Sequence, residues 1–151
     1  MTVVVRGFDG LKAMTGQHLG YSDWLEVTQD RINMFADATD DHQWIHVDIE
    51  RAKSGPFGGP IAHGYLTLSL LIPLWTELLE VQGITMGVNY GLNKVRFPAP
   101  LPVGAKIRLG ATLAAVTEVP GGVEALVDAV VESDAGVKPV CVAQVVYRYY
   151  A

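Results

Sequence analysis

Apolar residues recur along this chain with two spacings, which separate a helical part from a strand-rich part. Between 65 and 79 nearly every position is apolar, which predicts a helix that other elements surround on most sides. Pro73 removes one backbone hydrogen bond from this helix, so we expect a kink near 69–70. Beyond Gly83 apolar and polar residues alternate, and this period of two predicts β-strands.

The alternating part contains four expected strands, at 88–97, 106–118, 123–132 and 138–149. Segments rich in Pro, Gly, Ser and Asp separate them, and those at 120–122 and 133–136 are expected to be hairpin turns. Upstream, 24–28 alternates as a further strand, and Thr28 is suited to cap a helix that ends between 38 and 40. The apolar face of that helix holds Ile32, Phe35 and Ala36.

This order of elements predicts an α+β fold in which a five-stranded antiparallel sheet curls around one long helix. A chain of 151 residues can build one hydrophobic core but not two, so we expect a single domain, 1–151. Residues 1–20 show only the weak pattern of a short helix or an arm. Three glycines and two prolines between 52 and 60 exclude regular structure, so we expect a long ordered loop that overhangs the helix start.

Composition adds expectations about partners. Hydrophobic residues make up 50% of the chain and charged residues only 18%, so we expect an apolar subunit interface and an oligomer. The formal net charge of -5 argues against a nucleic-acid-binding protein, because neutralising phosphates requires clustered Lys and Arg.

The start of the chain and its longest apolar run bear on its location. Residues 1–10 include Arg6 and Asp9 and lack the apolar core of a signal peptide. The run at 65–79 falls short of the ~20 residues that a bilayer requires. We therefore expect a cytoplasmic protein with no membrane partner. The single cysteine, Cys141, lies between two valines, which predicts a buried thiol.

The densest group of reactive side chains is the segment 40–46, DDHQWIH. Asp41 and His46 are an acid and a base that can hold one water molecule between them. From spacing alone, Asp41 could also be a loop acid or a helix cap, and His46 a hydrogen-bonded, half-buried histidine. A metal site fits the composition but lacks the spacing of a known ligand set, so we expect no metal. The residues of such a metal site would be Asp41, His42, His46, Asp48 and His63.

Three motifs resemble those of one enzyme family. The segment 41–46, DHQWIH, is similar to the signature of the MaoC-like, (R)-specific enoyl-CoA hydratases, which runs Gly-Asp-x-Asn-Pro-aliphatic-His. The segment 60–64, PIAHG, is similar to the start of that family's central helix, and 97–104, FPAPLPVG, resembles its strand-end motif. The resemblance runs from about residue 20 to the C-terminus and is closest to the short, single-hotdog members, which include the NodN-like branch.

The resemblance implies a hotdog fold with a central helix near 64–80, and a homodimer joined edge to edge with the acyl tunnel along its interface. The implied reaction is reversible addition of water to a trans-2-enoyl-CoA, which gives an (R)-3-hydroxyacyl-CoA. Asp41 and His46 would activate the water, and the Gly64 amide would stabilise the enolate oxygen. No cofactor is implied, since coenzyme A is part of the substrate. The implied substrate-binding residues are Gln43, Ile61, His63, Lys94 and Arg96.

Three residues depart from the family's signature. Asp40 stands in place of Gly, Gln43 in place of Asn, and Trp44 in place of Pro. Gln43 keeps a carboxamide that can hold the acid or the water. Asp40 puts a second carboxylate beside Asp41, which disfavours ionisation of both. We therefore expect the substrate choice and the pH optimum to differ from those of the family more than the reaction type does.

Other interpretations stay open at this point. A hotdog thioesterase would share the fold, but those enzymes usually carry an acid near the start of the central helix, and Glu77 lies far from it. The presence of both Asp41 and His46 opposes a non-catalytic acyl-thioester-binding subunit. A dehydratase of acyl carrier protein substrates would run the same chemistry backwards. His63 could make a structural hydrogen bond, and the cations of 94–96 could lie on solvated strand faces.

Overall fold

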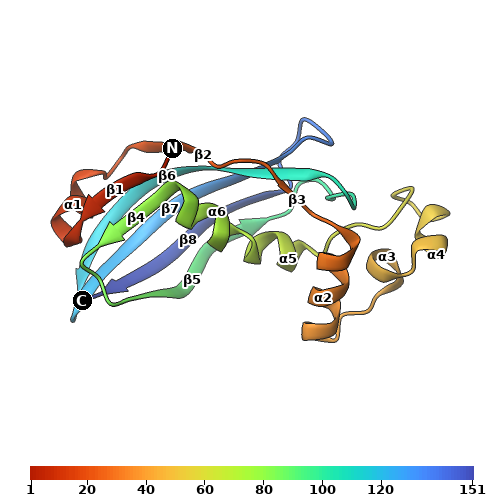
Figure 1. The fold of residues 1–151 in the computed structure, drawn as a ribbon, viewed down its shortest axis with the longest axis horizontal. Helices are drawn as coiled ribbons and strands as arrows, with labels where there is room; N and C mark the ends of the chain where they lie inside the picture. The colour runs from red at the N-terminus through yellow and green to blue at the C-terminus, as the bar shows by residue number, and fades with distance from the viewer.

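One curved antiparallel sheet forms the body of the molecule, and a broken helix packs against one of its faces (Figure 1). The computed structural model describes residues 1–151. The strands run in the order β2-β6-β7-β8-β5, and β3 also pairs with β6, so the sheet has six strands. Their bounds are β2 His18–Tyr21, β3 Leu25–Glu26, β5 Met86–Arg96, β6 Lys106–Val119, β7 Gly122–Ser133 and β8 Cys141–Tyr150.

The predicted hairpins join the three central strands. The β6–β7 pairing closes at Val119 opposite Gly122, and the turn between them contains Gly121 at a φ of 79°. Because a left-handed φ carries no steric penalty for glycine, this residue suits the tight turn. The second hairpin joins β7 to β8 through 134–140. The expected strand bounds were correct within a few residues: β5 begins at Met86 and β8 at Cys141.

The central helix is divided into α5 (Gly64–Ser69) and α6 (Leu71–Leu78). The break at Leu70 confirms the expected kink, because Pro73 has no N–H to donate to the carbonyl of Ser69. The helix ends at Leu78 rather than near 80, since Leu79–Gln82 turns into the strand β4. Most of its apolar residues are buried or half-buried. A single exposed stripe remains, formed by Tyr65, Ser69, Pro73 and Thr76.

The first 20 residues contribute more structure than an arm. They hold the strand β1 (Val3–Arg6), the expected short helix as α1 (Gly7–Ala13), and the strand β2. β1 pairs in parallel with β4, and Leu11 and Leu19 are buried in the core. The expectation of five strands in the sheet was therefore wrong, because it missed β2. The four residues of β2 are too few to show a clear alternation.

Three helices lie together beyond one end of the sheet, opposite α1 (Figure 1). They are α2 (Gln29–Thr39), α3 (Trp44–Val47) and α4 (Ile49–Lys53), and we call them the helical end. Thr28 caps α2 as expected, because its side chain accepts a hydrogen bond of 3.2 Å from the Arg31 N–H. α4 occupies the first part of the expected loop, and only 54–60 stays irregular. None of the helices combines the length and apolar character that a bilayer crossing requires.

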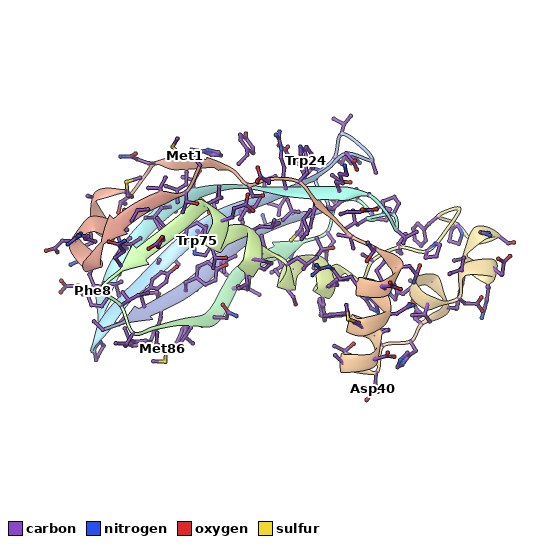
Figure 2. The ribbon with its side chains drawn as sticks, viewed as in Figure 1. Met1, Phe8, Trp24, Asp40, Trp75 and Met86 are labelled. Carbon is purple, nitrogen blue, oxygen red and sulfur yellow. The ribbon has the colours of Figure 1, made fainter.

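Aromatic side chains hold α6 against the sheet. Trp75 lies over the middle of the sheet (Figure 2), where its indole N–H donates a 2.8 Å hydrogen bond to the Tyr149 hydroxyl. Its ring stacks on Tyr147 at a centroid distance of 5.6 Å. This bond satisfies the polar tip of two buried aromatic residues, so both can contribute their full apolar area to the core.

The thiol of Cys141 offers a direct check of the core. It is buried as predicted, and burial raises its pKa to about 11. Because the thiolate is the reactive species, we expect no reaction of the native protein with a disulfide reagent at pH 8 and one thiol per chain after denaturation. Thiol titration with and without guanidinium measures both. Rapid labelling of the native protein would show that β8 does not close the core in this way.

Candidate active site

His46 is held from both sides in a defined orientation. Its Nδ1 lies 2.7 Å from the carbonyl oxygen of Ile61, and since a carbonyl can only accept, Nδ1 carries the proton. The Nε2 atom therefore keeps its lone pair. The Gln29 side chain of α2 donates a 2.9 Å hydrogen bond to the backbone oxygen of His46. The imidazole is thus fixed as an acceptor, with only 7% of the residue exposed.

Burial also keeps this imidazole neutral. Desolvation lowers the pKa of His46 below the ordinary value of 6.5. The hydrogen bond to Ile61 acts in the opposite direction, the neighbouring His63 lowers the pKa further, and the Asp41 charge raises it. Because burial outweighs the opposing contributions, His46 is a free base at neutral pH. Such a group can take a proton from water.

Asp41 brings a carboxylate to the same place from the exposed loop after α2. One ligand atom each of Asp41, His46 and His63 lie within 4.8 Å of one another. A water molecule about 2.8 Å from each of two acceptors can bridge atoms at this separation. These residues share a pocket of about 260 Å³. Its lining is Asp41, His46, His63, Gly64, Tyr65 and Phe97.

Gly64 places a backbone donor at the wall of this pocket. It is the first residue of α5, where an N–H has no acceptor within its own helix. A Cβ on Gly64 would lie 3.1 Å from the Phe97 ring, which is tighter than ordinary packing. Glycine therefore lets Phe97 lie close to the backbone. The arrangement can stabilise negative charge on an oxygen that enters the pocket.

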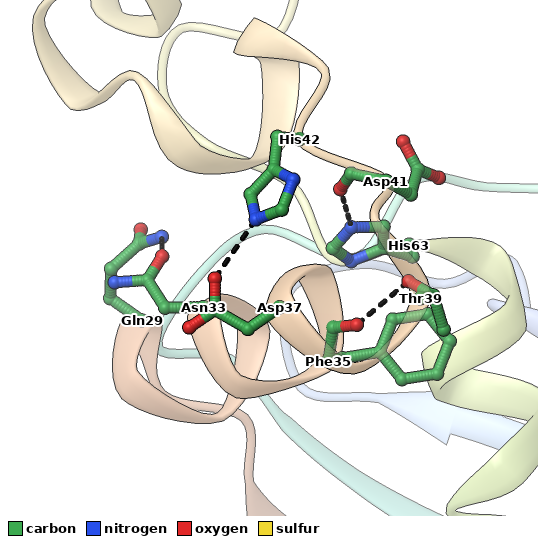
Figure 3. Close-up of polar contacts among 8 residues, drawn as sticks. All are labelled: Gln29, Asn33, Phe35, Asp37, Thr39, Asp41, His42 and His63. Carbon is green, nitrogen blue, oxygen red and sulfur yellow. Dashed lines mark hydrogen bonds and ion pairs between the residues drawn. The ribbon is translucent and has the colours of Figure 1, made fainter.

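His63 contacts Asp41, as Figure 3 shows, and also the ring of His46. Its Nε2 lies 2.9 Å from the backbone oxygen of Asp41, and its ring stacks on His46 at 3.8 Å between centroids. Figure 3 shows the Asp41 carboxylate directed away from this hydrogen bond. The alternative of a structural hydrogen bond for His63 is confirmed, and the residue also lines the pocket.

Comparisons with known proteins show to which family the chain belongs. The MaoC like domain matches residues 11–135. The chain belongs to the MaoC-like family. It is 51% identical over 142 residues to 3-hydroxyacyl-thioester dehydratase Z of Mycobacterium tuberculosis, covering 93% of this chain and 94% of the relative. It is 53% identical over 95 residues to Nodulation protein N of Rhizobium leguminosarum bv. viciae, covering 62% of this chain and 59% of that protein.

Solved structures confirm the hotdog fold. The (R)-hydratase from A. caviae involved in PHA biosynthesis superposes with a TM-score of 0.72. The match covers 88% of this chain and 94% of that one, at 22% sequence identity. At this identity the likeness establishes the fold alone. The chain is therefore a single-hotdog member of the MaoC-like family.

Some residues that the family resemblance implies lie outside the pocket. Gln43 is the N-cap of α3, and its backbone oxygen accepts from the His46 N–H, but its side chain is exposed and makes no hydrogen bond. Ile61 contributes its carbonyl oxygen to His46 rather than a pocket wall. Lys94 and Arg96 are exposed on β5. Substrate binding by these four residues stays a prediction.

Other residues of the site were not expected. Tyr65 and Phe97 line the pocket, with their rings 6.3 Å apart, and Gln29 steadies His46 from α2. Tyr65 follows Gly64 in sequence and Phe97 opens the matched segment 97–104, so both could have been suspected. Gln29 lies 17 positions before His46, and only tertiary packing reveals its role.

The five residues of the alternative metal site do not all come together. His42 instead lies 2.9 Å from the Asp37 carboxylate, and Asp48 caps α4 by accepting from the Arg51 N–H. Asp41, His46 and His63 do come together, but the two imidazole rings are stacked with 23° between their planes. Metal ligation uses lone pairs in the ring plane, and lone pairs of stacked rings do not converge on one ion. The three residues suit a water better than a metal.

The backbone of Asp40 explains its departure from the family signature. Asp40 is the C-cap of α2 and adopts φ 60° and ψ 20°, a left-handed conformation. Glycine enters this region freely, whereas Asp and Asn are among the few other residues that tolerate it. The family's Gly and this chain's Asp therefore solve the same geometric problem.

Substitution of Asp40 tests this backbone constraint. Asp40→Val is expected to lower the free energy of unfolding by about 1–2 kcal/mol, because a β-branched residue is disfavoured in the left-handed region. Asp40→Asn is the matched control and should stay close to the wild type. Urea denaturation of the three proteins measures the difference. Equal stability of the Val and Asn variants would contradict the left-handed cap.

The lowered pKa of His46 predicts a pH dependence of stability. Below pH 6.5 the unfolded chain takes up a proton at His46 more readily than the folded chain does. The part of the free energy of unfolding that depends on neutral His46 is therefore fully present above pH 6.5 and is lost as the pH falls toward the folded pKa. The stability of the wild type relative to His46→Gln should therefore decrease between pH 7 and pH 5. Parallel urea titrations at several pH values measure this, and a constant difference would argue against a buried neutral imidazole.

Proposed function

We propose that this protein catalyses the reversible hydration of a trans-2-enoyl-CoA to an (R)-3-hydroxyacyl-CoA. The observation that carries the proposal is that a carboxylate oxygen of Asp41 and a ring nitrogen of His46 lie within 4.8 Å of each other in one pocket. The free N–H of Gly64 lies at the wall of the same pocket. Water activation and thioester polarisation thus have groups of suitable chemistry close together.

The steps follow from these positions. Asp41 and His46 hold one water and remove its proton as the oxygen attacks the β-carbon. Electrons of the double bond move onto the thioester oxygen, where the Gly64 N–H stabilises the negative charge. The pair then returns a proton to the α-carbon, and the enolate collapses to the product. Since the same pair would hold the water and return its proton, hydroxyl and proton would add to the same face of the double bond.

The reverse direction is the same chemistry. The Mycobacterium tuberculosis relative is named a 3-hydroxyacyl-thioester dehydratase. Removal of water from the hydroxyacyl thioester uses the same acid/base pair with the roles exchanged, by microscopic reversibility. The name of this relative therefore supports the proposed reaction and leaves the net direction to substrate concentrations.

A second cavity is suited to the acyl chain. It has a volume of about 200 Å³ and lies between the central helix and the strands β5 and β8. Leu68 and Ile72 line it along the helix, four and eight positions beyond Gly64. At 1.5 Å per residue these lie about 6 and 12 Å along the helix from Gly64. We infer that the acyl chain extends from the thioester in this direction, along the helix rather than under the helical end.

The free edge of β5 is suited to a homodimer. β5 pairs with β8 on one side and with no strand on the other. Met86, Tyr90 and Leu92 on this strand are large, apolar and exposed. Pairing of two β5 edges would satisfy their backbone groups and cover these side chains. The acyl cavity contains Asn89, Gly91 and Leu92 of β5, so it would lie beside this interface.

Coenzyme A enters as part of the substrate, and the reaction needs no further cofactor. Acid/base groups and a backbone donor suffice for addition of water to an activated double bond. Arg96 precedes the pocket residue Phe97, so its guanidinium is a candidate contact for a coenzyme A phosphate. Lys94 lines a separate hollow with Asp128 and Gln144 and is the weaker candidate.

A thioesterase is less well supported. The acid of the central helix, Glu77, accepts a 2.6 Å hydrogen bond from the Asp23 N–H. Glu77 also lies outside the pocket of Asp41 and His46. Its contacts assign it to the anchoring of the chain before β3 rather than to hydrolysis.

Kinetics of single variants test the proposal. With trans-2-enoyl-CoA substrates of short and medium length, the wild type should consume the conjugated thioester and form the (R)-3-hydroxy product. Asp41→Asn and His46→Gln should each lose about 10²-fold or more in kcat, because a positioned acid/base group contributes at least this much. His42→Gln is the matched control, since His42 pairs with Asp37 at the surface and should retain activity.

Two outcomes would contradict the proposal. Release of free coenzyme A at equal rates in the wild type and both variants would indicate a hydrolase. Absence of any turnover, with tight acyl-CoA binding that survives both substitutions, would indicate a binding subunit. Turnover of acyl carrier protein substrates alone would keep the reaction and change the carrier.

A further inference from the structure

One imidazole contacts every part of the proposed active site. The His63 ring lies against His46 on one side and Phe35 of α2 on the other, at centroid distances of 3.8 and 4.9 Å. Its Nε2 bonds to the backbone oxygen of Asp41. In sequence it directly precedes Gly64.

The hydrogen bond fixes which nitrogen of His63 carries a proton. A carbonyl oxygen can only accept, so Nε2 is the donor. The other nitrogen, Nδ1, is buried and has no hydrogen-bond partner, and the residue is only 2% exposed. A proton on Nδ1 would be a buried donor without an acceptor. The neutral Nε2–H form is therefore the one that the site accommodates.

The backbone of His63 fixes the start of the central helix. Its carbonyl accepts from the N–H groups of Leu66 and Thr67, at 3.1 and 3.2 Å. A movement of the His63 backbone would therefore move the first turn of α5 and the Gly64 amide with it. The same residue thus sets the distance between the helix start and the loop of Asp41.

We propose that His63 is a positioning residue that holds Asp41 in register with His46 and Gly64. The inference rests on the hydratase function proposed above. The stacked ring also covers His46 from solvent, and burial disfavours the charged form of an imidazole. The titratable groups that face His46 are Asp41, from the loop, and His63, from the start of the helix; α2 contributes the uncharged Gln29.

Two substitutions separate positioning from packing. His63→Phe keeps an aromatic ring between Phe35 and His46 but loses the N–H that binds the Asp41 carbonyl. Since small displacements of reacting groups are costly, we expect kcat to fall about 10- to 100-fold with a KM within about threefold of the wild type. His63→Gln can place an amide N–H where Nε2–H lies, so it should recover most of the lost kcat. His42→Gln again serves as the matched control.

The pH profile distinguishes this role from a structural one. In His63→Gln the ring that stacks on His46 and shields it from solvent is absent, so the pKa of His46 should rise. The acidic limb of kcat/KM should then move to higher pH than in the wild type and in His42→Gln. Equal losses in the Phe and Gln variants, with an unmoved limb and a matching decrease in thermal stability, would overturn the proposal.

Histidine ¹⁵N NMR of the unliganded protein provides a test that does not depend on turnover or on the folding of variants. The wild type should show His63 with Nε2 protonated and Nδ1 bare at neutral pH. An Nδ1–H form would overturn the proposal, because the bond to Asp41 could not exist. If the wild type has no hydratase activity but this tautomer is found, the proposed function fails while the ring arrangement stands.

Discussion

The buried hydrogen bond between His46 and the Ile61 carbonyl is the contact on which the site depends. It spans 2.7 Å and joins the helical end to the segment that leads into the central helix. A second bond, from the Ile61 N–H to the Ile45 oxygen at 3.0 Å, closes the same connection. Because an unpaired polar group in this buried place would be costly, the two segments are held together strongly. The acid/base loop and the helix start can therefore act as one site.

The rest of the fold keeps that connection in place. The Ala62 N–H donates to the Leu101 oxygen, and the Val103 N–H donates to the Pro60 oxygen. These bonds hold the segment after β5 against the chain before the central helix. Further along, α6 is anchored by Trp75 in the curve of the sheet. The apolar core thus fixes the axis of the helix, and the polar contacts at its start fix the pocket. Burial of His46 and the lowering of its pKa are consequences of this packing.

The sequence predicted those features whose cause is local. Proline without an N–H predicts the break at Leu70, the Thr28 hydroxyl predicts the start of α2, and alternation predicts the long strands. Short strands such as β2 have too few residues for a pattern to emerge. The motif resemblance brought Asp41, His46 and Gly64 together, and the structure gathers them in one pocket. The stack of His46 on His63 depends on tertiary packing between segments 17 positions apart, so no local pattern could reveal it.

The central claim is that Asp41 and His46 deliver water from one side of the substrate. The most direct measurement is hydration of a trans-2-enoyl-CoA in D₂O, followed by NMR assignment of the α- and β-carbon configurations of the product. Delivery of both the water and the proton by the same pair predicts syn addition, with deuterium and hydroxyl on the same face. Anti addition would require the acid and the base on opposite faces, and it would contradict the arrangement of Asp41 and His46.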